Sequence, residues 1–128
     1  MEEKQIENPQ ALEELTTLAI RVTMRREFLK YKPSGSHVKY SRTYDLPQKM
    51  IDQGEITRSA ILSLIATTRK EVRSIESVRF GTITRIIKNG EVIARNFQPV
   101  GELTTAGYGF PKLESYPIPQ ELLDMANN

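Results

Sequence analysis

The sequence contains no cysteine, no tryptophan and a single histidine. The lack of cysteine excludes disulfide bonds, a thiolate nucleophile, an iron–sulfur cluster and a thiolate zinc site. Long apolar runs are also absent: the longest uncharged stretch, Ser59–Thr68, has ten residues, about half of what a membrane-spanning helix needs. The first residues, Met-Glu-Glu-Lys-Gln, are acidic and unlike a signal peptide, so we expect a cytoplasmic protein with no membrane partner.

What the sequence does contain is typical of one globular domain. The chain has 128 residues, of which 38% are hydrophobic and 27% are charged. A typical domain has roughly 100–150 residues, and this composition is that of a folded rather than a disordered chain.

The net charge of +2 hides an uneven distribution. Residues 21–95 contain sixteen basic and seven acidic residues, a net charge of +9, whereas the two flanks contain two basic and nine acidic residues, a net charge of −7. A basic central region suits binding to nucleic acid or another polyanion. Two other interpretations stay open: the acidic ends contact the basic region of the same or a neighbouring copy, or the charges cluster on a solvated surface.

Two long helices are expected. Apolar residues at spacings of three and four predict the first over residues 9–31, beginning at Asn8-Pro9 and stopped by Pro33. The second is expected over residues 58–73, with Thr57 as its N-cap.

Between these helices the sequence predicts a strand and a short helix. Residues 37–44 are rich in aromatic and β-favouring residues and are expected to form the strand. Residues 46–53 are expected to form the short helix, which ends at Gly54.

Asn89-Gly90 lies between two β-rich runs and predicts a β-hairpin with a type I′ turn. A two-residue turn sets the expected pairs: Lys88 with Glu91, Ile87 with Val92, Ile86 with Ile93 and Thr82 with Phe97. The predicted core face consists of Phe80, Thr82, Thr84, Ile86, Ile93 and Phe97. The other face combines Arg79, Arg85 and Asn96 with Ile83, Ile87 and Val92, and is apolar enough to meet another strand or a partner.

The last thirty residues are rich in proline and glycine, and Pro119 is suited to open a short helix over Gln120–Ala126. We therefore expect an α+β core domain over residues 1–98. Residues 99–128 are expected to form a C-terminal arm that packs on the core or on a neighbouring subunit.

The predicted fold is a single α+β domain: two long helices, a short helix and a strand between them, a C-terminal β-hairpin and an irregular Pro/Gly-rich arm. This order of elements is similar to that of a winged-helix domain. The resemblance implies that residues 46–53 and the helix from Arg58 form a helix-turn-helix, in which Arg58, Ser59 and Ser63 reach base edges. Lys88-Asn89-Gly90 would then be the tip of the wing.

Catalytic and metal-binding motifs are scarce. His37 is the only histidine, no ligand spacing typical of a metal site occurs, and Gly107-Tyr108-Gly109 is more typical of a turn than of a phosphate-binding loop. We expect no enzyme activity, no metal and no cofactor. An enzyme or small-ligand protein is the third hypothesis, and a deep pocket that holds Asp45, Asp52 or His37 with a perturbed pKa would support it.

The leading hypothesis is a non-enzymatic nucleic-acid-binding protein. Basic and aromatic residues alternate between Arg25 and Arg42, a mixture suited to phosphate contacts and base stacking. The candidate contact residues are Arg25, Arg26, Lys30, Lys32, Lys39, Arg42, Arg58, Ser59, Arg69, Lys70, Arg73 and Lys88. The alternative is a structural subunit of a multi-copy complex, a homo-oligomer or an assembly with other proteins, whose acidic ends and C-terminal arm contact its neighbours.

Overall fold

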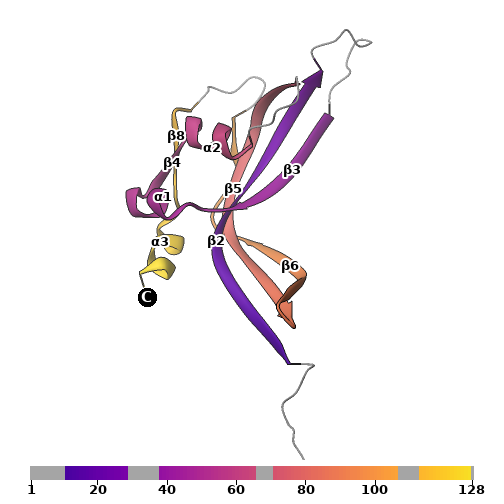
Figure 1. Ribbon diagram of the computed structural model, residues 1–128. Coiled ribbons are helices and arrows are strands. Elements are labelled where there is room, and N and C mark those ends of the chain that lie inside the picture. The colour runs from indigo at the N-terminus through magenta and orange to yellow at the C-terminus, as the bar shows by residue number, and fades with distance from the viewer. Residues whose placement is uncertain (1–10, 29–37, 66–70, 107–112, 128) are drawn as a thin grey trace, which may run out of the picture.

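A computed structural model describes residues 11–28, 38–65, 71–106 and 113–127, and in residues 25–28, 38 and 71–74 it describes the backbone alone. The fold is mostly β, with one curled antiparallel sheet and a small second layer on one side of it (Figure 1). The main sheet contains β2 (Leu12–Phe28), β3 (Val38–Asp45), β5 (Glu71–Lys88), β6 (Glu91–Pro99) and β7 (Thr104–Thr105). The second layer contains α1 (Gln48–Gln53), β4 (Glu55–Thr57), α2 (Arg58–Leu64), β8 (Ser115–Pro117) and α3 (Gln120–Ala126).

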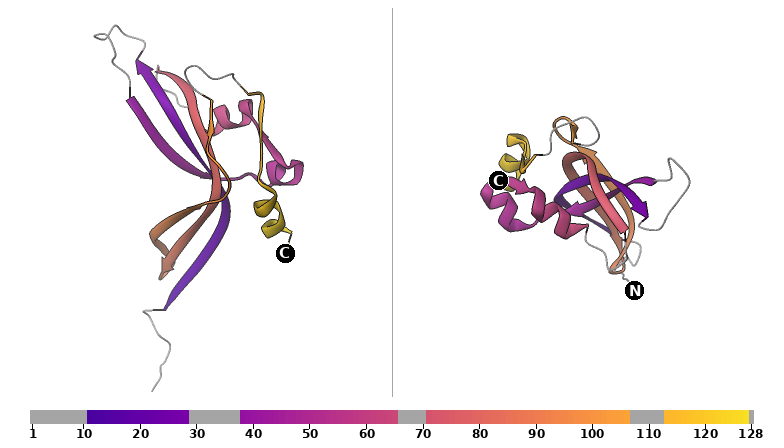
Figure 2. Two further views of the ribbon diagram at one scale, coloured as in Figure 1. Left: turned by 180° about the vertical axis from the view of Figure 1, so that it is seen from behind. Right: turned by 90° about the horizontal axis from the view of Figure 1, so that it is seen from above.

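The strand order of the main sheet is β3-β2-β5-β6, and β7 pairs with β5 next to β6. The longest ladder joins β2 to β5, from the pair Leu12–Lys88 to the pair Phe28–Glu71. In the second layer, β4 and β8 form a two-stranded sheet with Ile56 opposite Tyr116. The sheet bends near its middle, and both of its ends turn away from the second layer (Figure 1 and Figure 2, left). The uncovered face of the sheet is therefore its concave face.

The prediction of an α+β fold with two long helices and a winged-helix order is wrong. The segment expected to be the first helix, residues 9–31, contains the strand β2, and the helix expected over residues 58–73 is α2, which ends at Leu64. In β2 the apolar side chains also alternate with a period of two, and its many threonine, valine and isoleucine residues favour a strand. Because β5 offers a partner along the whole length of β2, the strand wins over the helix.

The main core lies between the sheet and the second layer. Ile20, Val22 and Met24 of β2 are fully buried there, and burial of each such side chain stabilises the fold by about 1.5–3 kcal/mol. A β-bulge changes the register of β5, so that Thr23 is paired with Ser77 and Met24 with Ile75. Glu76 is the extra residue, and because of it the side chains of both Ile75 and Val78 point into the core.

Local predictions based on turns and caps are confirmed. Gly54 ends α1 with a φ of +80°, and the Thr57 hydroxyl accepts a hydrogen bond of 3.1 Å from the Ala60 N–H at the start of α2. The helix expected over Gln120–Ala126 is α3. Residues beyond 98 belong to the same core as β2, to which they contribute Ala106, Tyr116, Ile118 and Leu122.

The predicted hairpin is confirmed at its turn, but the residue pairs farther along its strands differ from the prediction. Asn89 and Gly90 have φ angles of +54° and +82°, as a type I′ turn requires. The pairs Lys88–Glu91 and Ile87–Val92 are also confirmed, but the predicted partners beyond them are wrong: Ile86 pairs with Ala94 and Thr82 with Gln98.

The physical reason is a second bulge. Ile93 is an extra residue in β6, and one extra residue moves every later side chain of a strand to the other face. Phe97 therefore pairs with Ile83 and lies on the concave face with Arg79 and Arg85, not on the predicted core face.

Gly81 permits the close approach of β6 at the bend. A Cβ atom at this position would lie 2.8 Å from Cζ of Phe97 and still closer to the backbone carbonyl oxygen of Gln98. No side chain fits there without movement of the β6 backbone. The absence of a side chain at Gly81 thus leaves room for the Phe97 ring to lie close to the floor of the concave face.

A buried hydroxyl group of the core gives a testable prediction. The Tyr116 hydroxyl has no hydrogen-bond partner among the described residues, and burial raises the pKa of Tyr116 above its ordinary value of 10.0, with Arg58 as a smaller, opposing influence. We expect Tyr116→Phe to leave the free energy of unfolding at pH 7 unchanged or to raise it by about 1 kcal/mol, because the orphaned hydroxyl is removed.

The pH dependence has a defined sign. In the unfolded chain Tyr116 releases its proton near pH 10, below the raised pKa of the folded state, so the wild-type protein loses stability as the pH rises through 10. The advantage of the Phe variant therefore grows above pH 10. Urea denaturation at pH 7 and at alkaline pH measures both effects, and a loss of about 2 kcal/mol at pH 7 would contradict this account.

Candidate functional site

The concave face carries most of the described basic side chains of the sheet. By register and strand alternation its basic residues are Arg21, Lys39, Arg79, Arg85 and Arg95, and its acidic residues are Glu13 and Asp45, together with Glu76 at the bulge, which forms an ion pair with Lys39. Hydroxyl groups of Thr23, Ser41 and Thr43 lie on the same face. Basic and hydroxyl side chains together supply the donors that phosphate oxygens accept.

Arg85 is a structural arginine. Its Nη2 donates to both carboxylate oxygens of Asp45, at 2.9 and 3.0 Å, and its Nη1 donates to Oγ1 of Thr17 at 3.1 Å. Thr17 in turn donates to Asp45 at 2.9 Å. This network joins β5, β2 and β3, so the charge of Arg85 is neutralised within the fold.

Arg21 and Arg79 differ from Arg85 because neither has an acidic partner among the described residues. The two residues are directly opposite each other in the β2–β5 ladder. Within the part of the chain that the structure describes, neither forms an ion pair with a carboxylate. Like charges at directly opposed positions destabilise a sheet by up to about 1 kcal/mol. The fold therefore bears an electrostatic cost at this position.

Arg21 is held in place by neutral contacts. Its Nε donates to Oγ1 of Thr43 at 3.0 Å, and its guanidinium carbon lies 4.3 Å from the centroid of the Phe97 ring. A guanidinium over an aromatic ring is a favourable cation–π arrangement. These contacts fix the group and leave its terminal N–H donors available.

The hydrogen-bond donors of Arg79 are less completely paired than those of Arg85. Its Nη2 donates to the backbone carbonyl of Gly101 at 3.0 Å, whereas its Nε is buried and finds no hydrogen-bond partner in the described part of the chain. A buried donor without a partner costs about 1–3 kcal/mol.

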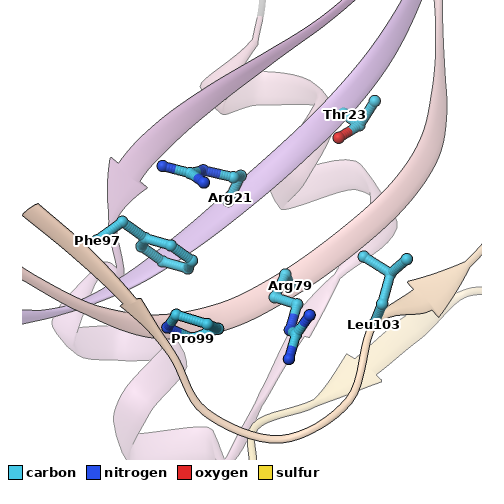
Figure 3. Close-up of a pocket in the computed structure, with 6 residues that line it drawn as sticks. All are labelled: Arg21, Thr23, Arg79, Phe97, Pro99 and Leu103. Carbon is cyan, nitrogen blue, oxygen red and sulfur yellow. The ribbon is translucent and has the colours of Figure 1, made fainter.

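A pocket of about 220 Å³ opens beside these two arginines. Arg21 and Thr23 from β2 and Arg79 from β5 form its polar part, while the apolar part comes from β6 and the segment after it (Figure 3). The apolar residues are Phe97, Pro99 and Leu103. A second pocket, of about 300 Å³ between α1 and α3, has no basic residue in its lining and contains Asp52. An anion therefore fits the first pocket and not the second.

The structure does not bring the predicted contact residues together. Lys39 lies on the concave face and forms an ion pair with Glu76 at 3.6 Å. Arg42 lies on the opposite face of β3, with its guanidinium 5.6 Å from the Tyr40 ring centroid. Three others are far from both: Arg58 and Ser59 begin α2 in the second layer, and Lys88 lies at the hairpin turn.

The other predicted residues are not fully described. Arg25, Arg26 and Arg73 belong to the paired strands β2 and β5, but their side chains are outside the description. Lys30, Lys32, Arg69 and Lys70 lie outside the described residues, as do His37 and residues 107–109.

Arg21, Arg79 and Phe97 were not among the predicted contact residues. Alternation along residues 77–88 already indicates that Arg79 and Arg85 share a face. No sequence signal places Phe97 on that face, because its direction depends on the bulge at Ile93. Nor does the sequence place Arg21 opposite Arg79, since that requires the pairing of segments about sixty residues apart.

Other kinds of site find little support in the described residues. Asp45 is engaged by Arg85, and Asp52 accepts a hydrogen bond of 2.9 Å from Gln48. The described residues contain no group of three or more acidic, histidine or cysteine side chains that would hold a metal ion. No described helix is long and apolar enough to cross a membrane. Comparisons of the chain with protein-family models, with curated proteins and with solved structures gave no match.

The contrast between the arginines gives a prediction about stability. Arg79→Met keeps an unbranched side chain but removes one of two opposed charges and the unpaired Nε. We expect the free energy of unfolding to stay the same or to rise, within about 1 kcal/mol. Arg85→Met leaves Asp45 and Thr17 without their donor and is expected to cost about 1 kcal/mol or more. Urea denaturation of both variants measures this order, and a larger loss for Arg79→Met would overturn it.

Proposed function

We propose that the protein is a non-enzymatic nucleic-acid-binding protein and that the concave face of its sheet is the binding surface. The observation that carries this proposal is the Arg21–Arg79 pair: two opposed guanidinium groups on an uncovered face, without a described acidic partner. A polyanion supplies the charge that the pair lacks. A cytoplasmic location is part of the same proposal, because nucleic acid is abundant there.

The charges around the pair support a polyanion rather than a single small anion. Arg95 is exposed on the same face, and Arg85 adds no net charge because Asp45 neutralises it. A chain of phosphates that follows the concave face meets Arg21, Arg79 and Arg95 in succession. Phosphate contacts of this kind provide most of the affinity of non-specific nucleic-acid binding.

Hydroxyl groups beside the arginines suit the same ligand. Thr23 and Ser41 are hydrogen-bonded to each other at 2.7 Å, and Thr43 accepts from Arg21. Threonine and serine hydroxyls commonly contact phosphate and sugar oxygens. The concave face thus offers both charged and neutral donors.

A role as a subunit of a multi-copy assembly is the second candidate, and one observation favours it. Large apolar side chains are exposed near the hairpin end of the sheet, at Leu12, Leu15, Val92 and Ile93. Exposed apolar patches often mark protein–protein contacts. Sedimentation velocity distinguishes the candidates, because assembly predicts larger species in the absence of nucleic acid.

The proposal predicts salt-dependent binding that requires Arg79. We expect binding to nucleic acid at low salt, with log K falling linearly with log [salt] by about 0.7–0.9 for each phosphate contacted. Arg79→Gln is expected to weaken binding several-fold and to reduce that slope by about one contact. Fluorescence anisotropy over a range of salt concentrations measures both quantities.

Arg42→Gln is the matched control, because it removes the same charge from the covered side of the sheet. It should leave the affinity and the slope close to the wild-type values. Absence of binding at low salt would contradict the proposal, and so would an equal loss in the two variants.

A further inference from the structure

The pocket beside the arginine pair has two chemically different sides. Arg21, Thr23 and Arg79 provide hydrogen-bond donors, and Phe97, Pro99 and Leu103 provide an apolar wall (Figure 3). Leu103 is 52% exposed although it lines the pocket. A surface that binds phosphates alone does not need an apolar wall.

The size of the pocket limits what enters it. Pockets for drug-sized ligands and cofactors measure about 300–1,000 Å³, and this one measures about 220 Å³. It therefore suits a fragment of a larger ligand, such as one phosphate or one planar ring. The rest of that ligand must lie along the concave face outside the pocket.

The polar side has unused donors for an anionic group. A guanidinium carries five N–H donors, of which Arg21 uses its Nε for Thr43 and Arg79 uses its Nη2 for Gly101. The remaining Nη–H donors of Arg21 and of Arg79 are each able to donate to a phosphate oxygen.

The apolar side suits a nucleobase. Aromatic and aliphatic side chains on an open surface accept the flat faces of unpaired bases, and such stacking tolerates any base. In the present fold the Arg21 guanidinium covers one face of the Phe97 ring, and the tip of the ring lies close to Gly81. The wall open to a base therefore consists of Pro99, Leu103 and the part of the Phe97 ring that Arg21 leaves uncovered.

We propose, on the basis of the nucleic-acid-binding function above, that this pocket makes the protein prefer single-stranded over double-stranded nucleic acid. It takes a phosphate on its arginine side and the adjacent unpaired base against Pro99, Leu103 and the open part of the Phe97 ring. In a duplex the bases are stacked and paired, so a base reaches the wall only after it has been extruded from the helix.

The test compares a short single strand with a duplex of the same sequence at one salt concentration, by fluorescence anisotropy, using DNA and RNA in parallel. We expect the wild-type protein to bind the single strand about tenfold more tightly, the size of one base-stacking contact. Leu103→Ser should reduce the affinity for the single strand several-fold and leave the affinity for the duplex nearly unchanged. Phe97→Leu should do the same through loss of the ring.

Leu12→Ser is the matched control, because Leu12 is exposed to a similar degree, 57%, and does not line the pocket. Equal binding of single strand and duplex by the wild-type protein would overturn this inference and leave the proposed function intact. An equal loss in the Leu103 and Leu12 variants would also overturn it. Failure of both nucleic acids to bind would instead refute the proposed function itself.

Discussion

The antiparallel pairing of β2 with β5 determines where nearly every side chain of the sheet lies. Once Ile20, Val22 and Met24 point into the core, the residues between them must point to the concave face. Arg21 is one of these residues, and register places Arg79 opposite it. The opposed arginines are therefore a consequence of the same ladder that builds the core, and the fold tolerates them on its uncovered side.

Two bulges adjust this arrangement in opposite directions. The bulge at Glu76 keeps Ile75 in the core. The bulge at Ile93 shifts the pairing of β6 by one residue, so that Phe97 lies on the concave face. Gly81 then allows the Phe97 ring to lie close to the strand beneath it. A cation–π contact with Arg21 completes a site assembled from β2, β5 and β6.

The features predicted correctly from the sequence depend on neighbouring residues alone. Asn89-Gly90 specifies its turn by positive φ angles, Gly54 ends a helix, and Thr57 caps the next one. The prediction of a long helix over residues 9–31 is wrong because the apolar residues of 12–28 fit a helical and an alternating pattern equally well. The choice depends on a partner strand that begins at Glu71, which a local pattern does not reveal.

The same limit applies to the candidate site. Charge counting correctly indicates a basic region between residues 21 and 95, but it does not tell Arg21 and Arg79 on the concave face from Arg42 on the covered one. Pairing also decides which arginines are neutralised, since Asp45 lies beside Arg85 only after β3 has joined the sheet. Because the register of the paired strands brings these residues together, the site is recognised only in the folded chain.

The central claim is that the concave face binds nucleic acid through the arginine pair. Nuclear magnetic resonance titration of the isotope-labelled protein with a short single strand tests it most directly. The account predicts that the Nε–H signals of Arg21 and Arg79 and the amides of Thr23 and Gly101 shift most, while Ile61 and Leu122 in the core beneath the second layer stay unchanged. Shifts centred on α1, α2 and α3, with Arg21 and Arg79 unaffected, would contradict it.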